Sequence, residues 1–247
     1  MAMYDFSQFD KDLEDWGIVL DSGQKRQFIM YYELLKEWNT FMNLTAITDY
    51  DQVLKKHFVD SLSLVKGLDI LGDRDKIHTM NVIDVGTGAG FPGIPLKIVF
   101  PKMKITLLDS LNKRIKFLDQ VVYKLDLNDV DTLHGRAEDF AKPGKLRERF
   151  ELCVSRAVAN LSTLAEYALP FVKIGGYFIA YKSEKLEEEM EKAQKAISLL
   201  GGQIAGKTDF LLPDSDIVRS LLVVKKVKPT PVKYPRKAGL PTKEPLG

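Results

Sequence analysis

Residues 81–90 read Asn-Val-Ile-Asp-Val-Gly-Thr-Gly-Ala-Gly, a short apolar run that ends at closely spaced glycines. A β-strand that opens through a tight turn into a helix has this pattern, because glycine permits backbone angles that other residues resist. Further strand-like runs follow at 104–109, 129–134, 150–154 and 176–181, and apolar residues at helical spacing separate the second run from the third. This alternation predicts βαβ units and a mainly parallel sheet.

The last two strand-like runs, 203–212 and 217–227, are separated only by Pro213-Asp214-Ser215-Asp216. A parallel crossover needs about a dozen residues, so this pair must be antiparallel. The seven runs together predict an α/β, Rossmann-like fold in which an antiparallel hairpin forms one edge of the sheet.

The flanking segments differ from this central part, which we place at residues 78–227. Residues 1–77 read as a helical extension. One apolar stripe there has helical spacing, and a second helix around 53–65 is expected to end near Gly67. The stripe consists of Phe28, Tyr31, Tyr32, Leu35 and Trp38. Residues 228–247 hold five prolines and five Lys or Arg, which predicts an extended basic tail or surface arm and no folded element.

Composition excludes several classes of protein. The chain has 247 residues, of which 45% are hydrophobic and 28% charged, as in ordinary globular proteins. A single cysteine, Cys153, excludes an internal disulfide, and three histidines without ligand spacing predict no metal site. No apolar run is long enough to span a membrane, and the N-terminus lacks the features of a signal peptide. We therefore expect a cytoplasmic protein with no membrane partner.

The glycine-rich turn is the strongest functional signal. Gly86, Gly88 and Gly90 allow a ligand to approach the backbone closely, and the Asp84 carboxylate suits a cationic group. A dinucleotide site is the rival interpretation, because Gly88, Gly90 and Gly93 also fit G-x-G-x-x-G. That register leaves Asp84 without a role. The turn resembles instead the first motif of Rossmann-like methyltransferases that use S-adenosylmethionine (SAM). A turn that binds nothing is the simplest alternative.

Three further positions follow later strands at the same edge of the sheet, where ligands of α/β proteins bind. Asp109 is placed to accept hydrogen bonds from ribose hydroxyls, or to cap the next helix. The backbone at Ala137 and Glu138 is placed to meet an adenine ring, or to begin a short helix. Arg156 is placed to contact cofactor or substrate, or to pair with an acid such as Asp84, Asp109 or Glu138.

Charge is unevenly distributed along the chain. Residues 1–77 hold 14 acidic and 9 basic residues, so most of the positive charge lies in the remainder. Aromatic and cationic residues alternate with prolines in the tail, a combination that suits nucleic acid. We expect the tail's cations to contact RNA phosphates, unless the tail is disordered and binds nothing. They are Lys228, Lys233, Arg236, Lys237 and Lys243.

An ordered set of motifs resembles the RsmG (GidB) family of bacterial guanine-N7 methyltransferases of small-subunit ribosomal RNA. The matching segments are 43–48 (NLTAIT), 56–62 (KHFVDSL), 84–95 (DVGTGAGFPGIP), 108–114 (LDSLNKR), 135–139 (GRAED), 155–158 (SRAV) and 234–241 (YPRKAGLP). The resemblance implies a seven-stranded class I SAM-dependent fold with an N-terminal helical extension. It also implies a cofactor site lined by Gly86, Phe91, Ala137, Glu138 and Arg156.

The resemblance predicts methyl transfer from SAM to N7 of a guanine in 16S ribosomal RNA, with the small ribosomal subunit as partner. Because N7 keeps a lone pair at neutral pH, no general base is needed, and no histidine lies beside the glycine-rich turn in the sequence. Arg156 is the one candidate catalytic residue, as an orienting group, and we expect a monomer. The alternatives are a small-molecule methyltransferase and a ribosome-associated RNA-binding protein without activity.

Overall fold

The computed structural model describes residues 4–72, 74–156, 159–183 and 186–247. Its centre is a seven-stranded sheet with the order β3-β2-β1-β4-β5-β7-β6. The strands are β1 (Asn81–Val85), β2 (Lys104–Asp109), β3 (Val130–His134), β4 (Phe150–Ser155), β5 (Val172–Lys182), β6 (Gly202–Leu211) and β7 (Val218–Lys226). The first five run parallel, and β7 is antiparallel to both β5 and β6. The predicted Rossmann-like sheet and its edge hairpin are confirmed.

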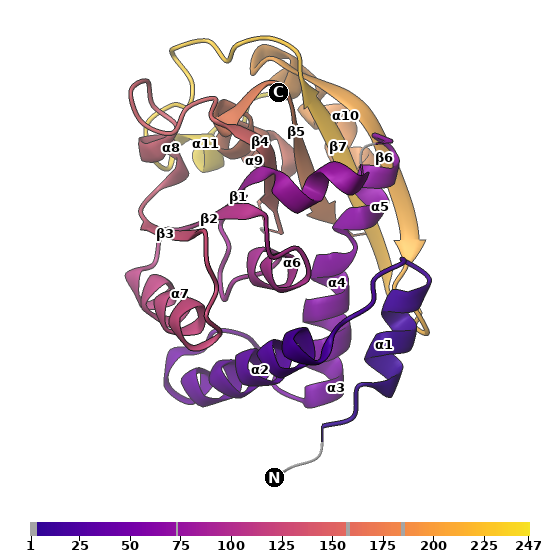
Figure 1. Cartoon of the computed structure of the whole chain (residues 1–247). Coiled ribbons are helices and arrows are strands. Elements are labelled where there is room, and N and C mark those ends of the chain that lie inside the picture. The colour runs from indigo at the N-terminus through magenta and orange to yellow at the C-terminus, as the bar shows by residue number, and fades with distance from the viewer. Residues whose placement is uncertain (1–3, 73, 157–158, 184–185) are drawn as a thin grey trace.

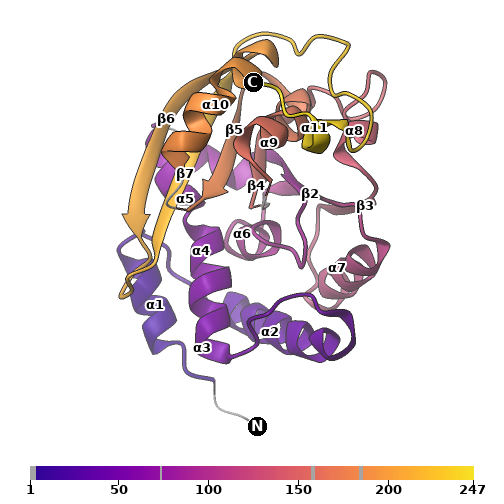
Figure 2. The ribbon, with the colours of Figure 1, turned by 180° about the vertical axis from the view of Figure 1, so that it is seen from behind.

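Helices cover both faces of the sheet (Figures 1 and 2). One apolar cluster joins α1 (Ser7–Glu14), α2 (Ser22–Met42), the helical stretch from 50 to 69, α6 (Gly93–Val99) and α7 (Asn112–Lys124) to one face. The other face packs against α8 (Ala137–Phe140), α9 (Leu161–Ala168), η3 (Leu169–Phe171) and α10 (Leu186–Leu199). Alternation along β1 divides its side chains between the clusters, with Val82 in the first and Ile83 and Val85 in the second.

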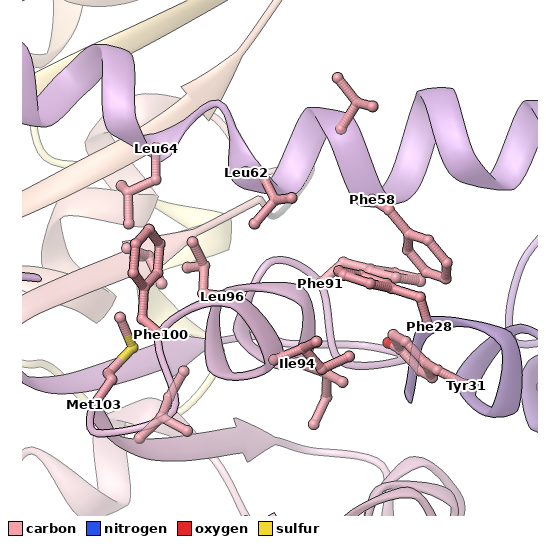
Figure 3. Close-up of a cluster of buried hydrophobic side chains, with 14 of the residues drawn as sticks. Phe28, Tyr31, Phe58, Leu62, Leu64, Phe91, Ile94, Leu96, Phe100 and Met103 are labelled. Carbon is pink, nitrogen blue, oxygen red and sulfur yellow. The ribbon is translucent and has the colours of Figure 1, made fainter. Parts of the chain in front are cut away.

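The N-terminal helices share the core of the sheet. In α2, Asp21 and Gln24 form a capping box at the start, and Phe28 and Tyr31 are fully buried on the predicted stripe. Figure 3 shows Phe28 and Tyr31 close to Phe58 and to Phe91 of the glycine-rich loop. The ring centroids of Tyr31 and Phe91 are 5.5 Å apart. The extension therefore fixes the loop that follows β1.

A second helical stretch comprises α3 (Tyr50–Val53), a π-helical turn η1 (Leu54–Val59), α4 (Asp60–Leu62) and α5 (Leu64–Asp69). It continues two residues past Gly67, where the sequence predicted its end. A side chain at Gly67 would lie 3.3 Å from Ile179 Cδ1, so glycine serves here for close packing on the sheet. A 3-10 turn, η2 (Arg74–Thr79), leads into β1.

The segment after β7 follows the surface over α8 and α9 (Figure 2). Tyr234 is buried in the core of that face, and a short helix, α11 (Leu240–Lys243), lies near the end of the chain. The segment therefore runs along the surface, and the prediction that it holds no folded element is wrong. Pro241 lies within the first turn of α11, where proline is compatible with a helix.

Within the described ranges, no helix is both long enough and apolar enough to cross a bilayer.

Candidate functional site

The glycine-rich turn after β1 forms one side of a cavity. Gly86 has φ +74° and Gly88 has φ +63°, angles that side-chain-bearing residues rarely adopt. A Cβ added at Gly88 would meet no atom within 4 Å, so its Cα borders open space. Gly90 differs, because a Cβ there would lie 2.7 Å from Ile94 and 2.8 Å from the Tyr31 hydroxyl. Gly86 and Gly88 therefore border the cavity, while Gly90 lets the turn pack on the helices behind it.

Asp84 lies beneath the turn and holds it in place. Its Oδ2 accepts hydrogen bonds from Thr87 Oγ1 at 2.6 Å and from Gly93 N at 2.9 Å. Its Oδ1 is buried without a hydrogen-bond partner among the described residues. Burial raises the pKa of Asp84 to about 7, although the bonds from Thr87 and Gly93 oppose the rise. The carboxylate does not line the cavity, so it would act on a cationic ligand there only through its charge.

The cavity beside the turn has a volume of about 390 Å³, within the usual range for small-ligand sites. It brings together seven of the nine residues predicted to bind cofactor, and Asp84 and Gly90 lie behind its wall. The seven are Gly86, Gly88, Phe91, Asp109, Ala137, Glu138 and Arg156. The sequence did not predict Thr45, Arg114 or Tyr167, which also line it.

Asp109 ends β2 beside the turn. Of the two roles that the sequence left open, the N-cap of α7 is instead Leu111, and ribose binding stays a prediction. The Asp109 Oδ2 accepts from Gly88 N at 3.0 Å and from Arg114 at 3.1 Å. Its Oδ1 accepts from Leu111 N at 2.9 Å, at the start of α7. Both lone pairs of Oδ2 are therefore engaged, and Oδ1 retains one for a hydroxyl of a ligand.

Another part of the wall is formed by the first residues of α8, which follows β3. Ala137 and Glu138 begin this four-residue helix, and both line the cavity. The Glu138 carboxylate is 2% exposed and accepts a hydrogen bond from Gly239 N at 2.9 Å. The short helix that was the alternative interpretation is thus present, and it forms part of the cavity wall.

Arg156 lies at the end of β4 and forms an ion pair, although with none of the three acids that the sequence suggested. Its partner is Asp60, at 2.7 Å, which also accepts from Arg219 at 2.8 Å. The guanidinium carbon of Arg156 lies 4.9 Å from the centre of the Phe91 ring. Its motif neighbours Ala157 and Val158 lie outside the described residues. A partner 96 positions away in the chain carries no local sequence signal.

A second cavity, of about 440 Å³, shares Arg156 with the first. Four cationic side chains and two acidic ones are among the groups that line it. The lining consists of Lys56, His57, Asp60, Arg156, Tyr181, Lys182, Ser183, Glu189 and Arg219. The positive excess of this cavity suits an anionic or electron-rich ligand.

His57 corrects the expectation that no histidine lies beside the turn, because its ring stacks on Phe91 with centroids 4.5 Å apart. Its Nδ1 lies 3.3 Å from Arg156 Nη2, and its Nε2 lies 2.8 Å from Thr45 Oγ1. Nδ1 also lies 3.1 Å from the carbonyl oxygen of Lys56. Burial, reinforced by Arg156, lowers the pKa of His57 to about 4. The imidazole is therefore neutral at physiological pH, and both nitrogens are engaged.

The residues present fit SAM. The open space at Gly88 admits a ligand close to the backbone, and a buried carboxylate without a partner on one oxygen lies below it. Asp109 would accept from the ribose hydroxyls, and the backbone at Ala137 and Glu138 would face the adenine. Within the described residues, no group of three or more His, Cys, Asp or Glu has an arrangement suited to a metal ion.

Replacing Asp84 with asparagine tests the electrostatic part of this assignment. The side-chain oxygen of the new amide can still accept from Thr87 and Gly93, so Asp84→Asn is expected to keep the fold. SAM should bind about fivefold more weakly, a loss of roughly 1 kcal/mol from an attraction screened by the protein. S-adenosylhomocysteine, which lacks the sulfonium charge, should lose less affinity. Calorimetry with both ligands measures the difference.

The SAM affinity of the unaltered chain and that of Asp84→Asn are expected to depend differently on pH. Asp84 is protonated below pH 7 in the free protein, since its pKa is about 7. A cationic ligand favours the ionised form, so SAM affinity of the unaltered chain should rise between pH 6 and pH 8. In Asp84→Asn, any change of SAM affinity with pH comes from the ligand's own amino group. The plots of SAM affinity against pH for the two proteins should therefore diverge as the pH rises. Parallel curves would contradict an electrostatic role for Asp84.

Comparisons with known proteins give the relatives of this chain. A family model described as rRNA small subunit methyltransferase G matches residues 24–211. The chain is 52% identical to ribosomal RNA small subunit methyltransferase G of Lachnoclostridium phytofermentans, over 99% of this chain and 98% of the relative. It is 47% identical to the protein of the same name from Clostridium tetani, over the full length of both.

Solved structures support the fold. A crystal structure of a mutant of MtNAS matches with a TM-score of 0.53 at 16% identity, over 91% of this chain and 82% of that chain. At this identity the likeness concerns the fold alone. With the strand order above, it supports a Rossmann-like α/β fold.

Proposed function

This chain belongs to the rRNA small subunit methyltransferase G family, and from that premise we propose that it transfers a methyl group from SAM to N7 of a guanine in 16S ribosomal RNA. The observation that carries the proposal is the pair of cavities that meet at Arg156. A methyl donor and its acceptor must lie next to each other, and two adjoining cavities supply that arrangement.

The chain's part in the reaction is to position two ligands. SAM, when bound, supplies an electrophilic methyl group on its sulfonium. Gly86, Gly88 and Asp109 hold that ligand from one side, and Ala137 and Glu138 from the other. The second cavity receives the guanine, whose O6 suits the donors of Arg156 or Arg219 and leaves N7 free.

The guanine must leave any helix before it can enter such a cavity. N7 lies on the major-groove edge, and the major groove of A-form RNA is too deep and narrow for side chains to read. We therefore expect the target to lie in a loop, or to be extruded at a cost of about a few kcal/mol. Lys56 and Arg219 then face the neighbouring phosphates, whereas Lys182 is nearly buried and paired with Glu189.

RNA with 7-deazaguanine at the target position tests the acceptor atom. This base keeps its shape and its O6 but lacks the N7 lone pair, so it should accept no methyl group at all. A competition assay with natural RNA confirms that the modified RNA still binds. Methylation of the deaza substrate would move the acceptor to another atom and refute the proposal.

The pH dependence of the rate tests the absence of a general base. With the pKa of His57 at about 4, this residue does not titrate between pH 6 and pH 9. At saturating SAM and RNA, the single-turnover rate should be constant across that range. A rate that rises tenfold per pH unit and then levels would reveal a catalytic base that the proposed reaction does not include.

The same pKa has a consequence for stability. Because the value lies below the 6.5 of an unfolded chain, His57 favours folding above pH 6.5, and this contribution is lost as the pH falls towards 4. The unfolding temperature should therefore fall between pH 6.5 and pH 4. This fall should be smaller in His57→Gln.

The basic arm after β7 is the proposed contact to RNA phosphates outside the cavities. Lys228, Lys233, Lys237 and Lys243 are exposed and suited to that role. Arg236 is not, because its guanidinium donates to the buried Glu166 at 2.6 Å and 2.9 Å. The proposal of a phosphate contact through Arg236 is therefore withdrawn. We propose a monomer bound to the small ribosomal subunit as the working species.

A further inference from the structure

The C-terminal arm, defined here as residues 228–244, crosses the outer side of α8 and α9, the two helices that form part of the first cavity. Figures 1 and 2 both show α11 next to α8 and α9. Cofactor-binding sites of this fold lie at the carboxyl ends of the strands, and nothing in the glycine-rich turn requires an arm at this place. Its contacts indicate what it does there.

The first half of the arm is fixed by two cationic side chains. Lys226 is fully buried at the end of β7 and donates to the carbonyl of Leu169 at 2.7 Å and to Thr230 Oγ1 at 2.7 Å. Arg147 donates to the carbonyl of Tyr234 at 2.7 Å, and also to that of Thr230. Leaving these buried N–H groups without acceptors would cost folding free energy. The hydrogen bonds therefore fix the path of the arm over the surface.

The second half of the arm joins α8 to α9. Arg236 binds Glu166 of α9 through its backbone N at 2.8 Å and through its guanidinium, and Glu166 is fully buried. Three residues later, Gly239 N donates to Glu138 of α8 at 2.9 Å. Thr163 of α9 donates to the carbonyl of Pro241 at 2.9 Å.

The helix at one end of this bridge cannot hold its position alone. α8 has four residues, one turn, whereas an isolated helix needs about 12 to 15 residues to be even marginally stable in water. Its first two residues, Ala137 and Glu138, line the cavity. Their placement must come from tertiary contacts, and the hydrogen bond from Gly239 acts directly on one of them.

We propose that the arm is part of the cofactor site: through Gly239 N–H on Glu138 it holds α8 where the cavity needs it, with Gly239 as a positioning residue. This inference rests on the proposed function, since it takes SAM as the ligand of the cavity. It assigns the arm a role that is separate from contact with RNA.

Gly239→Val tests the proposal. Gly239 has φ +83°, and a Cβ there would meet no atom within 4 Å, so the substitution acts by forcing the backbone to a new angle and not by a clash. Loss of a hydrogen bond to a charged group should weaken binding of SAM and of S-adenosylhomocysteine about tenfold in calorimetry. The KM for SAM should rise in the same proportion as the loss of affinity.

Gly175→Val is the matched control. Gly175 has φ +85° and equally open surroundings, but it lies in β5, outside the cavity lining. Both variants should lower the unfolding temperature, and only Gly239→Val should change ligand affinity. In a second comparison, Glu138→Ala removes the acceptor. Adding Gly239→Val to Glu138→Ala should then weaken binding no further.

Three results would overturn the proposal. They are unchanged affinity in Gly239→Val, an equal loss in Gly175→Val, and full additivity of Gly239→Val with Glu138→Ala. Failure of the proposed function is distinguishable from these, because it would appear in the unaltered chain as absence of SAM binding.

Discussion

Replacing Gly88 with valine is expected to weaken SAM binding by about 100-fold or more, equivalent to at least roughly 2.7 kcal/mol, while the protein still folds. At φ +63°, a β-branched residue is strained, and its side chain would project into the open space beside the turn. A ligand that approaches the backbone at Gly88 would meet this side chain directly. Calorimetry with SAM measures the loss, and circular dichroism verifies the fold.

Gly72→Val separates the effect on the site from backbone strain. Gly72 has the same φ of +63°, and a Cβ there would also meet no atom within 4 Å. It lies between α5 and η2, outside both cavities. Each variant should lose about 1–3 kcal/mol of stability from the strained angle. Only Gly88→Val should lose affinity, and comparable SAM binding in both variants would contradict the assignment of the turn.

The second large effect is expected at Arg156. Arg156→Gln should reduce the rate at saturating SAM and RNA by about 100-fold or more, or roughly 2.7 kcal/mol of activation free energy. The change removes the one guanidinium that, among the described residues, borders both cavities and faces the Phe91 ring. Asp60 keeps Arg219 as a partner, so stability should fall by only about 1–3 kcal/mol.

Lys55→Gln provides the control for stability. Lys55 is paired with the buried Asp12, so its loss also leaves a buried carboxylate with fewer partners, but neither residue lines the two cavities. Rapid-quench measurement of methyl transfer should show the large rate defect in Arg156→Gln and none in Lys55→Gln. A normal rate in Arg156→Gln would remove Arg156 from the mechanism.

The strands could be predicted closely because their signals are local. The bounds of β1 and β2 agree with the sequence prediction at both ends. β5 is longer than predicted and begins at Val172. The missed part, 172–175, ends at Gly175, and glycine is uncommon in strands. The edge hairpin could be predicted because the loop between its two strands is too short for a parallel connection. That prediction did not depend on strand propensities.

The cavity could be predicted only where its residues follow a strand. Gly88, Asp109 and Arg156 stand at strand ends, and topology alone brings these ends together. His57 and Asp60 come from a helix almost 100 positions before Arg156 in the chain, and no periodic pattern reports such contacts. They lie in or beside a π-helical turn, an irregularity that often marks functional segments but has no reliable sequence signature.

The C-terminal arm shows a different limit of sequence interpretation. Composition indicated five cations for RNA, but Arg236 is paired with Glu166, a buried acid 70 positions earlier in the chain. The sequence alone does not show whether a cationic side chain is exposed to solvent or paired with a buried acid. The four exposed lysines keep the original interpretation.

The identity of the methylated nucleoside decides whether the proposed reaction is correct. Small ribosomal subunits from a strain lacking this gene are incubated with the protein and methyl-labelled SAM, and the 16S RNA is digested to nucleosides for mass spectrometry. We expect the label in 7-methylguanosine, in about one equivalent per subunit, and none from Gly88→Val. Label in any other nucleoside, or no label from a protein that binds SAM, would contradict the proposed methyl transfer to guanine N7.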